Sequence, residues 1–233
     1  MKLAIMQPYI FPYIGYFQLI NAVDTFVIYD NIQYTKKGWI NRNRILVNGK
    51  DEYFTLPLKK DSDFLNIDQR NLADTFPQDR IKLIRKITEA YRKAPYFDLA
   101  FPLVNAIINT EEINLFRFIY RSVVQVCEYA GIKTDIVISS TVNIDHQLRN
   151  QDKVMALCQA LGADIYINPV GGVELYSKET FKEKNIGLKF IQSTPVEYPQ
   201  LKHQHVPWLS MIDVMMFNSK EDIQKMLNAY TLK

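Results

Sequence analysis

The alternation of apolar and polar positions at the start of the chain predicts a strand, a helix and a second strand. Residues 3–6 form a short apolar run, and residues 17–23 repeat apolar side chains at helical spacing. Residues 25–29 are β-branched and aromatic, which favours a strand. The three elements predict a βαβ unit, in which the two strands are parallel and the crossover is right-handed.

The next stretch predicts a hairpin followed by helices. Residues 44–56 have the pattern of two strands, and Asn48-Gly49 is a strong signal for a two-residue turn between them. An apolar stripe at helical spacing predicts a helix over residues 77–92. Thr110, followed by two glutamates, predicts the N-cap of a further helix, which Gly131 ends.

Strands and helices then alternate to the end of the chain. Apolar runs predict strands at residues 135–138, 165–167 and 188–191, and helical patterns predict helices at 151–161, 178–184, 208–217 and 219–230. This alternation is typical of a parallel sheet. We therefore expect an α/β protein with a parallel sheet of about five strands flanked by helices. It would form a single domain over residues 1–233, with a hairpin and helix-rich insert at about 44–131.

Composition narrows the class of protein. Hydrophobic residues make up 48% of the 233 residues, enough for a proper core, and the net charge of +3 is too small to indicate nucleic-acid binding. Cys127 and Cys158 lie in apolar helical patterns and are expected to be buried thiols in a reducing compartment. Neither a signal peptide nor a membrane-spanning run is apparent, so we expect a cytoplasmic protein. The oligomeric state and any cofactor are not indicated.

The ends of the predicted strands supply candidate ligand-binding residues, because open α/β sheets bind ligands at the carboxyl edge. The candidates are Gln7, Asp30, Ser139, Ser140, Asn168, Gly171 and Gly172. The adjacent glycines would let a ligand approach the backbone, and free N–H groups there can hold a phosphate. A tight turn alone is the alternative explanation.

A basic loop follows the second predicted strand. Its candidate ligand-binding residues are Lys36, Lys37, Trp39, Asn41, Arg42 and Arg44. Arginine offers a bidentate fork to phosphate or carboxylate, and an indole offers a stacking face. We expect this loop to face the turn over residues 7–16 across one cleft and to bind an anionic ligand. The alternative is a solvated charged loop.

Residues for catalysis are less clearly marked. His203 and His205 would point the same way on a strand, which suits a metal ion or a general base, and we take either histidine as a candidate general base. Asp61 and Asp63 form a pattern found in metal-dependent glycosyltransferases, but we assign no metal ligand. The sequence contains no GxSxG, Walker A or GxGxxG motif.

Three long motifs resemble a known family. The stretches IMQPYIFPYIGYFQLINAVDTFVIYDNIQYTKKGWINRNRI, ALGADIYINPVGGVELY and HVPWLSMIDVMMFNS are similar to sequences of the WbqC-like proteins of bacteria. This resemblance implies an association with surface-polysaccharide gene clusters, including O-antigen clusters that carry modified amino sugars. It does not by itself define the reaction.

A second resemblance concerns the fold. The segment from Tyr13 through Gly15 to Tyr16 is similar to the His-x-Gly-His turn of the nucleotidylyltransferase superfamily, and Ser139-Ser140-Thr141 resembles its later Ser-Ser-Thr segment. This implies a nucleotidylyltransferase-like (HUP-like) sheet, and it adds Tyr13 and Gly15 to the candidate ligand-binding residues. Both histidines are tyrosines here, so the resemblance supports the fold more than the reaction of that superfamily.

These inferences lead to one expected function and two alternatives. We expect an enzyme of surface-polysaccharide (O-antigen) precursor synthesis that transfers an acyl or aminoacyl group to a nucleotide-linked amino sugar. The cations of the basic loop would hold phosphates, and His203 or His205 would deprotonate the amine. The alternatives are a glycosyltransferase and a non-catalytic nucleotide-sugar-binding protein.

Overall fold

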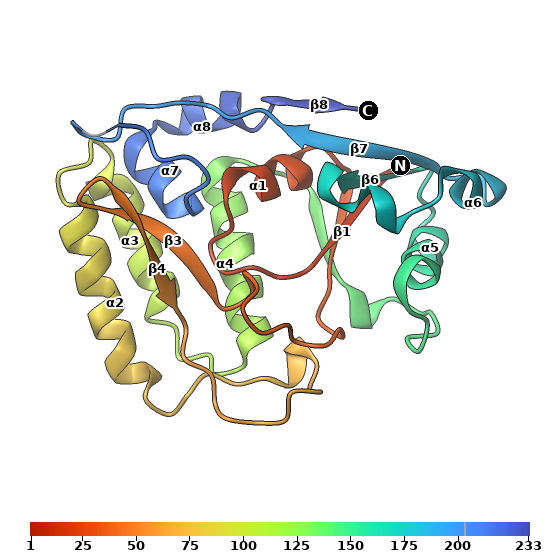
Figure 1. Ribbon diagram of the computed structural model, residues 1–233, viewed down its shortest axis with the longest axis horizontal. Helices are drawn as coiled ribbons and strands as arrows, with labels where there is room; N and C mark the ends of the chain where they lie inside the picture. The colour runs from red at the N-terminus through yellow and green to blue at the C-terminus, as the bar shows by residue number, and fades with distance from the viewer. Residues whose placement is uncertain (203) are drawn as a thin grey trace.

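The computed structural model describes residues 1–202 and 204–233. Its centre is a six-stranded sheet in the order β5-β2-β1-β6-β7-β8 (Figure 1). These strands are β1 (Lys2–Met6), β2 (Thr25–Ile28), β5 (Asp135–Ile138), β6 (Ile165–Pro169), β7 (Gly187–Ser193) and β8 (Tyr230–Leu232). All neighbouring pairs are parallel except β7 with β8. The predicted α/β architecture with a mostly parallel sheet is confirmed.

The order of the strands reverses at β1, which pairs with β2 on one side and β6 on the other. The first crossovers place β2 and β5 on one side of β1, and the later ones place β6 and β7 on the other. In open α/β sheets the loops at such a reversal diverge and leave room for a ligand. The turn that follows β1 therefore starts at the centre of the carboxyl edge.

Helices cover both faces of the sheet (Figure 1). One face packs against α1 (Ile14–Asn21), α4 (Leu115–Ala130), α7 (Met211–Phe217) and α8 (Lys220–Met226), and the other against α5 (Asn150–Ala160) and α6 (Lys178–Glu183). Alternate strand residues divide between the faces: Ala4 joins the first core cluster, and Leu3 and Ile5 join the second. Three short 3₁₀ helices, η1 (Ile67–Gln69), η2 (Ser139–Thr141) and η3 (Val170–Leu175), lie in the connections.

The insert adds a second sheet on the side away from α5 and α6. It contains the hairpin of β3 (Arg42–Val47) and β4 (Lys50–Thr55), then α2 (Phe76–Tyr91) and α3 (Phe97–Ile108). The predicted turn is confirmed, because Asn48 and Gly49 both have the positive φ angles, 52° and 78°, that a type I′ turn requires. One apolar cluster joins the hairpin and these helices to the main sheet.

Two predicted helix ends are wrong. Thr110 does not cap α4. Its N-cap is Asn114, whose side chain accepts a hydrogen bond of 3.1 Å from the N–H of Arg117. The backbone before it is held in place by Leu72, whose N–H donates to Ile113. At the end of the chain, α8 stops at Met226 and the backbone then pairs with β7, so β8 replaces the last predicted helical turn.

Candidate functional site

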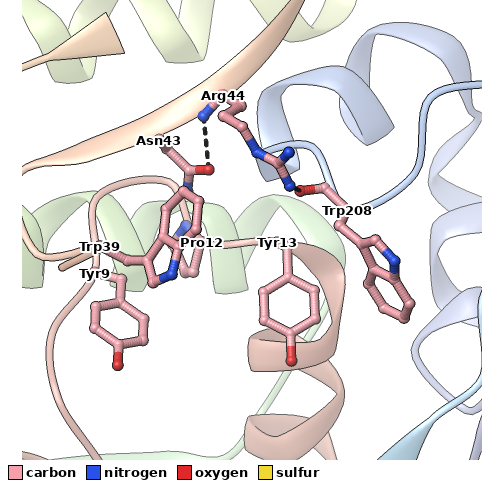
Figure 2. Close-up of a pocket in the computed structure, with 7 residues that line it drawn as sticks. All are labelled: Tyr9, Pro12, Tyr13, Trp39, Asn43, Arg44 and Trp208. Atoms are coloured by element: carbon pink, nitrogen blue, oxygen red, sulfur yellow. Dashed lines mark hydrogen bonds between the residues drawn. The ribbon is translucent and has the colours of Figure 1, made fainter. Parts of the chain in front are cut away.

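A pocket of about 280 Å³ lies where three segments far apart in the sequence meet (Figure 2). The segments are the turn after β1, the stretch at the start of β3, and the stretch before α7. Its lining residues are Tyr9, Pro12, Tyr13, Trp39, Asn43, Arg44 and Trp208. We call it the aromatic pocket. The turn over residues 7–16 and the basic loop thus line the same pocket, as predicted from the sequence.

Asn43 holds the turn after β1 in its place. Its buried side-chain amide donates to the carbonyls of Ile10, at 3.0 Å, and Phe11, at 2.8 Å. The N–H of Ile10 donates in turn to the carbonyl of Ile40. Phe11 has a φ of 41°, which is unusual for a bulky residue and which these contacts stabilise. The side chain that fixes the turn is therefore also part of the pocket wall.

The segment before α7 docks on both of the other segments. The N–H of Ser210 donates to the carbonyl of Arg44, and the N–H of Met211 donates to that of Pro12, both at 2.9 Å. Tyr13 and Ser210 also form an isolated antiparallel bridge. Trp208 has a φ of 60°, and strained bulky residues of this kind cluster at binding and catalytic sites.

Aromatic rings form most of the exposed wall. The rings of Tyr13 and Trp208 meet edge to face, with centroids 5.8 Å apart at 73°, and Trp39 stacks on Tyr53 at 6.0 Å and 21°. Trp39 and Trp208 are the two tryptophans of the chain, and they remain 38% and 45% exposed. Partly exposed aromatic side chains that line the same pocket are typical of a binding site.

The lack of a side chain at Gly15 leaves room for the ring of Tyr13 in the pocket wall. A Cβ atom on Gly15 would lie 2.3 Å from the ring of Tyr13. Real Cβ atoms do not approach other atoms so closely, so a side chain at residue 15 would displace the ring. The predicted site residue Gly15 is therefore linked to the pocket through Tyr13, although it does not line it.

Arg44 supplies the positive charge of the wall. Its Nη1 pairs with Asp51 at 2.9 Å, and its Nη2 donates to the carbonyl of Trp208 at 3.3 Å (Figure 2). The centre of the guanidinium lies 5.5 Å from the ring centroid of Trp39. The Nε group is buried, and no described residue accepts its hydrogen. Arg44 is thus partly neutralised by Asp51 yet retains an unused donor.

The other predicted cations do not line the pocket. Arg42 donates to the carbonyls of Gly38, at 2.9 Å, and Lys37, and its guanidinium lies 5.1 Å from the ring of Tyr53. These contacts shape the loop that carries Trp39. The predicted cluster of four phosphate-binding cations is therefore not brought together around one cavity.

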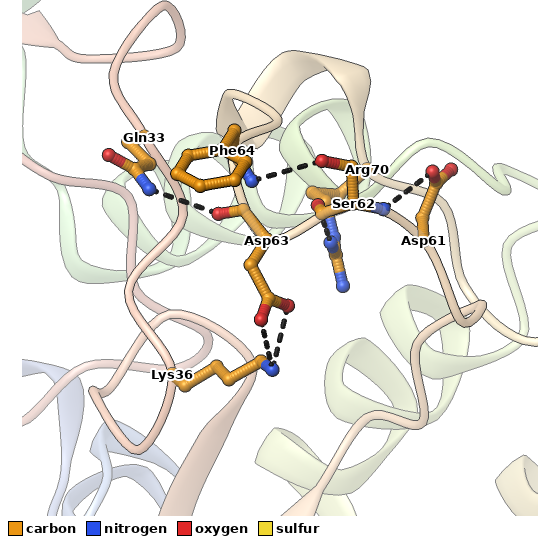
Figure 3. Close-up of polar contacts among 7 residues, drawn as sticks. All are labelled: Gln33, Lys36, Asp61, Ser62, Asp63, Phe64 and Arg70. Carbon is orange, nitrogen blue, oxygen red and sulfur yellow. Dashed lines mark hydrogen bonds and ion pairs between the residues drawn. The ribbon is translucent and has the colours of Figure 1, made fainter.

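Lys36 is held by the loop over residues 59–66 instead (Figure 3). Its ammonium pairs with both carboxylate oxygens of Asp63, at 2.6 and 2.8 Å. The carboxylate of Asp61 points away from that of Asp63 and accepts a hydrogen bond from the N–H of Ser62. The two aspartates of the glycosyltransferase-like pattern therefore do not converge. Within residues 1–202 and 204–233, no three acidic, histidine or cysteine side chains are placed to hold a metal ion.

Asp30, Ser139 and Ser140 form a second polar cluster at the ends of β2 and β5. The buried carboxylate of Asp30 accepts hydrogen bonds from the N–H and hydroxyl of Ser140 and lies 2.8 Å from the hydroxyl of Ser139. Asn31 connects this group to Lys153, whose Nζ lies 3.0 Å from its side-chain oxygen. The predicted site residues here are brought together, but away from the aromatic pocket.

Burial shifts the pKa values of two groups in this second cluster. Burial lowers the pKa of Lys153, and the nearby carboxylates of Asp30 and Asp68 offset part of that effect. Burial likewise raises the pKa of Asp68, and the charge of Asp30 raises it further. Because most polar atoms of the cluster are paired with one another, its evident role is to join the ends of the two strands.

Two further predicted ligand residues, Asn41 and Gln7, form hydrogen bonds with residues outside the aromatic pocket. Asn41 accepts a hydrogen bond from Tyr34 and donates one to Leu56, both at 2.8 Å. The carbonyl of Gln7, at the end of β1, accepts from the hydroxyl of Tyr16 at 3.0 Å. Neither residue lines the aromatic pocket.

The glycine pair after β6 has two different environments. A Cβ on Gly172 would lie 2.2 Å from the amide nitrogen of Asn168, so close packing accounts for this glycine. Asn168 itself lies 3.2 Å from the hydroxyl of Tyr166 and is buried. Gly171 has no atom within 4 Å of its added Cβ, so it faces open space. Only Gly171 remains available for close approach by a ligand.

His205 lies beside the aromatic pocket. It lines a smaller hollow that shares Trp208 with the pocket, and its Nδ1 lies 3.2 Å from the carbonyl of Tyr198. The other predicted base, His203, lies outside the described residues. Trp208 therefore lines both the aromatic pocket and the hollow that contains the candidate base.

Four pocket residues are absent from the sequence-based site: Tyr9, Pro12, Asn43 and Trp208. Tyr9 and Pro12 belong to the Pro- and Tyr-rich turn, whose composition was a usable signal. Trp208 follows a proline and is one of two tryptophans in the chain. A rare aromatic next to a turn residue was the signal for it.

The fold and the pocket define an α/β protein with a mostly parallel sheet and an aromatic, arginine-containing cavity beside a histidine. The model of the WbqC-like protein family matches residues 7–225, and the chain belongs to this family. It is 29% identical over 221 residues to Rv1507c of Mycobacterium tuberculosis, an uncharacterized protein, with 93% of each chain covered. No solved structure matches the chain.

Among the described residues, none of the helices combines the length and the apolar character that crossing a bilayer requires.

Proposed function

We propose that the protein is an enzyme of bacterial surface-polysaccharide (O-antigen) precursor synthesis that transfers an acyl or aminoacyl group to the amine of a nucleotide-linked amino sugar. The sugar ring would occupy the aromatic pocket. The observation that carries the proposal is the convergence of Trp39, Tyr13 and Trp208 with Arg44 around one cavity. Membership of the WbqC-like family supports the proposed role in polysaccharide synthesis. The strand order supports our further proposal of a nucleotidylyltransferase-like fold.

The chemistry of the pocket suits a sugar ring. A pyranose has apolar C–H faces, which aromatic rings cover favourably, and hydroxyl groups at its rim, which need polar partners. The volume of about 280 Å³ is near the lower end for small-molecule sites, so it fits one ring and its substituents. The nucleotide would extend out of the pocket past Arg44, which lies in its wall.

His205 is the proposed base. In the reaction, the amine of the sugar would attack the carbonyl carbon of a thioester or ester donor and form an amide. The amine proton would pass to the imidazole, and the thiol or hydroxyl of the donor would leave. A neutral histidine suits this step at physiological pH. His205 lines the hollow that adjoins the pocket and shares Trp208 with it, so the amine would have to reach this shared edge.

The alternatives make different demands on the residues. A glycosyltransferase that uses Asp61 and Asp63 needs both carboxylates on one metal ion, whereas Asp63 is paired with Lys36. A non-catalytic nucleotide-sugar-binding protein needs only the pocket. The latter is distinguished from an enzyme by whether a product forms.

The first test is binding. Calorimetry would titrate the protein at low salt with a panel of nucleotide-linked amino sugars. We expect one or more to bind, and we expect Trp39→Ala to weaken binding about 5- to 150-fold, since stacking on an aromatic side chain is worth about 1–3 kcal/mol. Phe64→Ala is the matched control, because Phe64 is 84% exposed and does not line the pocket. Equal loss in both variants, or no binding at all, would contradict the proposed ligand.

The second test is turnover. The bound nucleotide-sugar would be incubated with acyl-thioester and aminoacyl donors, and mass spectrometry would look for the acylated sugar. We expect His205→Gln to lower turnover about 10²- to 10⁴-fold with little change in affinity. Binding without any product from either donor class would favour the non-catalytic alternative.

A further inference from the structure

A buried carboxylate on α7 holds the chain segment that carries His205. Asp213 is fully buried. Its Oδ1 accepts a hydrogen bond of 2.9 Å from Tyr91, and its Oδ2 accepts bonds of 2.7 Å from the hydroxyl of Tyr198 and the amide of Gln200. Two of these three donors belong to the segment that leads to His205. The carboxylate is therefore the anchor of that segment.

The anchor reaches His205 through two short connections. The side chain of Gln200 accepts from the N–H of Val206 at 2.7 Å and lies 3.2 Å from its carbonyl. The backbone carbonyl of Tyr198 lies 3.2 Å from Nδ1 of His205, and the two rings meet edge to face at 4.9 Å. Fixing Tyr198 and Gln200 thus fixes the backbone and the ring of the histidine.

The contact with Tyr198 determines which ring nitrogen of His205 carries the proton. A carbonyl oxygen can only accept a hydrogen bond, so Nδ1 must be the donor. In the neutral imidazole, Nε2 then has a free lone pair, and no described residue is hydrogen-bonded to it. A free lone pair at Nε2 is the state that a general base requires.

We propose that Asp213 is a positioning residue that, through Tyr198 and Gln200, holds His205 in the Nδ1–H tautomer with Nε2 free to accept a proton. The relevance of this arrangement to catalysis rests on the proposed function, whereas the arrangement itself can be measured without any substrate. A buried carboxylate is costly compared with an apolar side chain, which is consistent with a role beyond packing.

The test is the nitrogen spectrum of the histidine side chains. Uniformly ¹⁵N-labelled protein at about pH 8, above the ordinary histidine pKa of about 6.5, would be recorded without ligand. His205 should show a protonated Nδ1 and an unprotonated Nε2. His146 is an internal reference with the opposite tautomer, because its Nε2 faces the carbonyl of Val142 at 3.0 Å and its Nδ1 accepts from Asn31. The variants His205→Gln and His146→Gln assign the signals.

Three variants separate positioning from stability. Asp213→Asn and Tyr198→Phe break the anchor, and we expect the Nδ1–H form of His205 to fall from the major to the minor tautomer. Tyr91→Phe is the matched control, because it also removes a hydroxyl from Asp213, whereas the other hydrogen bond of that hydroxyl is to Leu46 on β3 and not to the His205 segment. We expect it to lower the melting temperature and leave the tautomer unchanged.

Several results would overturn the proposal. An Nε2–H tautomer at His205 in the unmodified protein does so outright, and so does an unchanged tautomer in both Asp213→Asn and Tyr198→Phe. If Asp213→Asn fails to fold, the comparison of Tyr198→Phe with Tyr91→Phe decides. Since no ligand is present, failure of the pocket to bind a nucleotide-sugar would reject the proposed function and leave this result standing.

Discussion

The guanidinium of Arg44 donates a hydrogen bond of 3.3 Å to the backbone carbonyl of Trp208. On its other side, the same guanidinium pairs with Asp51 at 2.9 Å. One side chain on β3 therefore supplies positive charge to the aromatic pocket and also holds the backbone of the tryptophan that lines both this pocket and the hollow of His205.

Arg44 and Asp51 should have opposite effects on anion binding. Arg44→Ala should weaken binding of uridine diphosphate about 10- to 150-fold, since a charged hydrogen bond is worth about 1.5–3 kcal/mol. Asp51→Asn should tighten it by up to about fivefold, because the partly exposed ion pair it breaks is worth about 0–1 kcal/mol. Calorimetry at low salt measures both. Arg42→Ala should have a smaller effect, because Arg42 is hydrogen-bonded within its own loop. Equal losses for the two arginines would contradict this assignment.

Gly15→Ala should impair binding without unfolding the protein. The added Cβ would collide with the ring of Tyr13, which must then leave its place in the pocket. Replacing glycine inside a helix also gains up to about 1 kcal/mol of helix propensity, so the melting temperature should change little. Calorimetry with the best nucleotide-sugar measures the loss. In a double-mutant cycle, Gly15→Ala should add nothing to Tyr13→Ala, and fully additive losses would show that the collision is not the cause.

Stability should depend on pH through Asp213. Burial raises the pKa of this carboxyl above its ordinary value of 3.8, although its hydrogen bonds from Tyr198, Gln200 and Tyr91 lower it in part. The folded state therefore binds the proton more tightly than the unfolded state. Relative to Asp213→Asn, the free energy of unfolding should be highest below pH 3.8 and fall as the pH rises through the raised pKa. Urea denaturation across this range measures the difference.

Asp222 is the control for that measurement, because Lys225 and Ser219 lower the pKa of its exposed carboxyl. The sign is then reversed: the contribution of Asp222 is present above pH 3.8 and is lost as the pH falls through the lowered pKa. If the free energy of unfolding changed with pH in the same direction for Asp213→Asn and Asp222→Asn, burial would not be what determines the pKa of Asp213.

The two cysteines should be inert in the folded protein. Cys127 and Cys158 are free and buried, and burial raises the pKa of each thiol to about 12. At pH 8 the reactive thiolate is therefore about 10⁻⁴ of the total, whereas an unperturbed thiol with a pKa of about 8.5 is substantially ionised. A dithiobis(nitrobenzoate) reagent should label neither thiol rapidly until denaturant is added. Fast stoichiometric labelling of the native protein would contradict the buried positions.

The parts of the fold that local patterns specify were predictable. The first βαβ unit has short, strongly apolar strands, and the Asn48-Gly49 turn has its own backbone requirement. The strand β8 was not predictable, because its residues take their hydrogen-bond partners from β7 rather than from a pattern of their own. The cap at Asn114 was missed for a similar reason, since a contact with Leu72 holds the residues before it.

The site was predictable only in part. The turn after β1 and the residues Trp39 and Arg44 were identified from composition, and the structure places them around one pocket. The contacts of the neighbouring cations were not predictable, because Lys36 pairs with Asp63, which belongs to a loop that follows much later in the sequence. Trp208 was missed because its place depends on hydrogen bonds to segments that lie far earlier in the chain.

The docking of the segment before α7 on Pro12 and Arg44 has a consequence for biosynthesis. While the chain emerges from the ribosome, Tyr13 and Trp39 are made early, but the wall that Trp208 completes is among the last parts to appear. Contacts of such long sequence separation form late in folding. Any ligand that needs Trp208 as well as Tyr13 and Trp39 would therefore stabilise the chain only after this segment has docked.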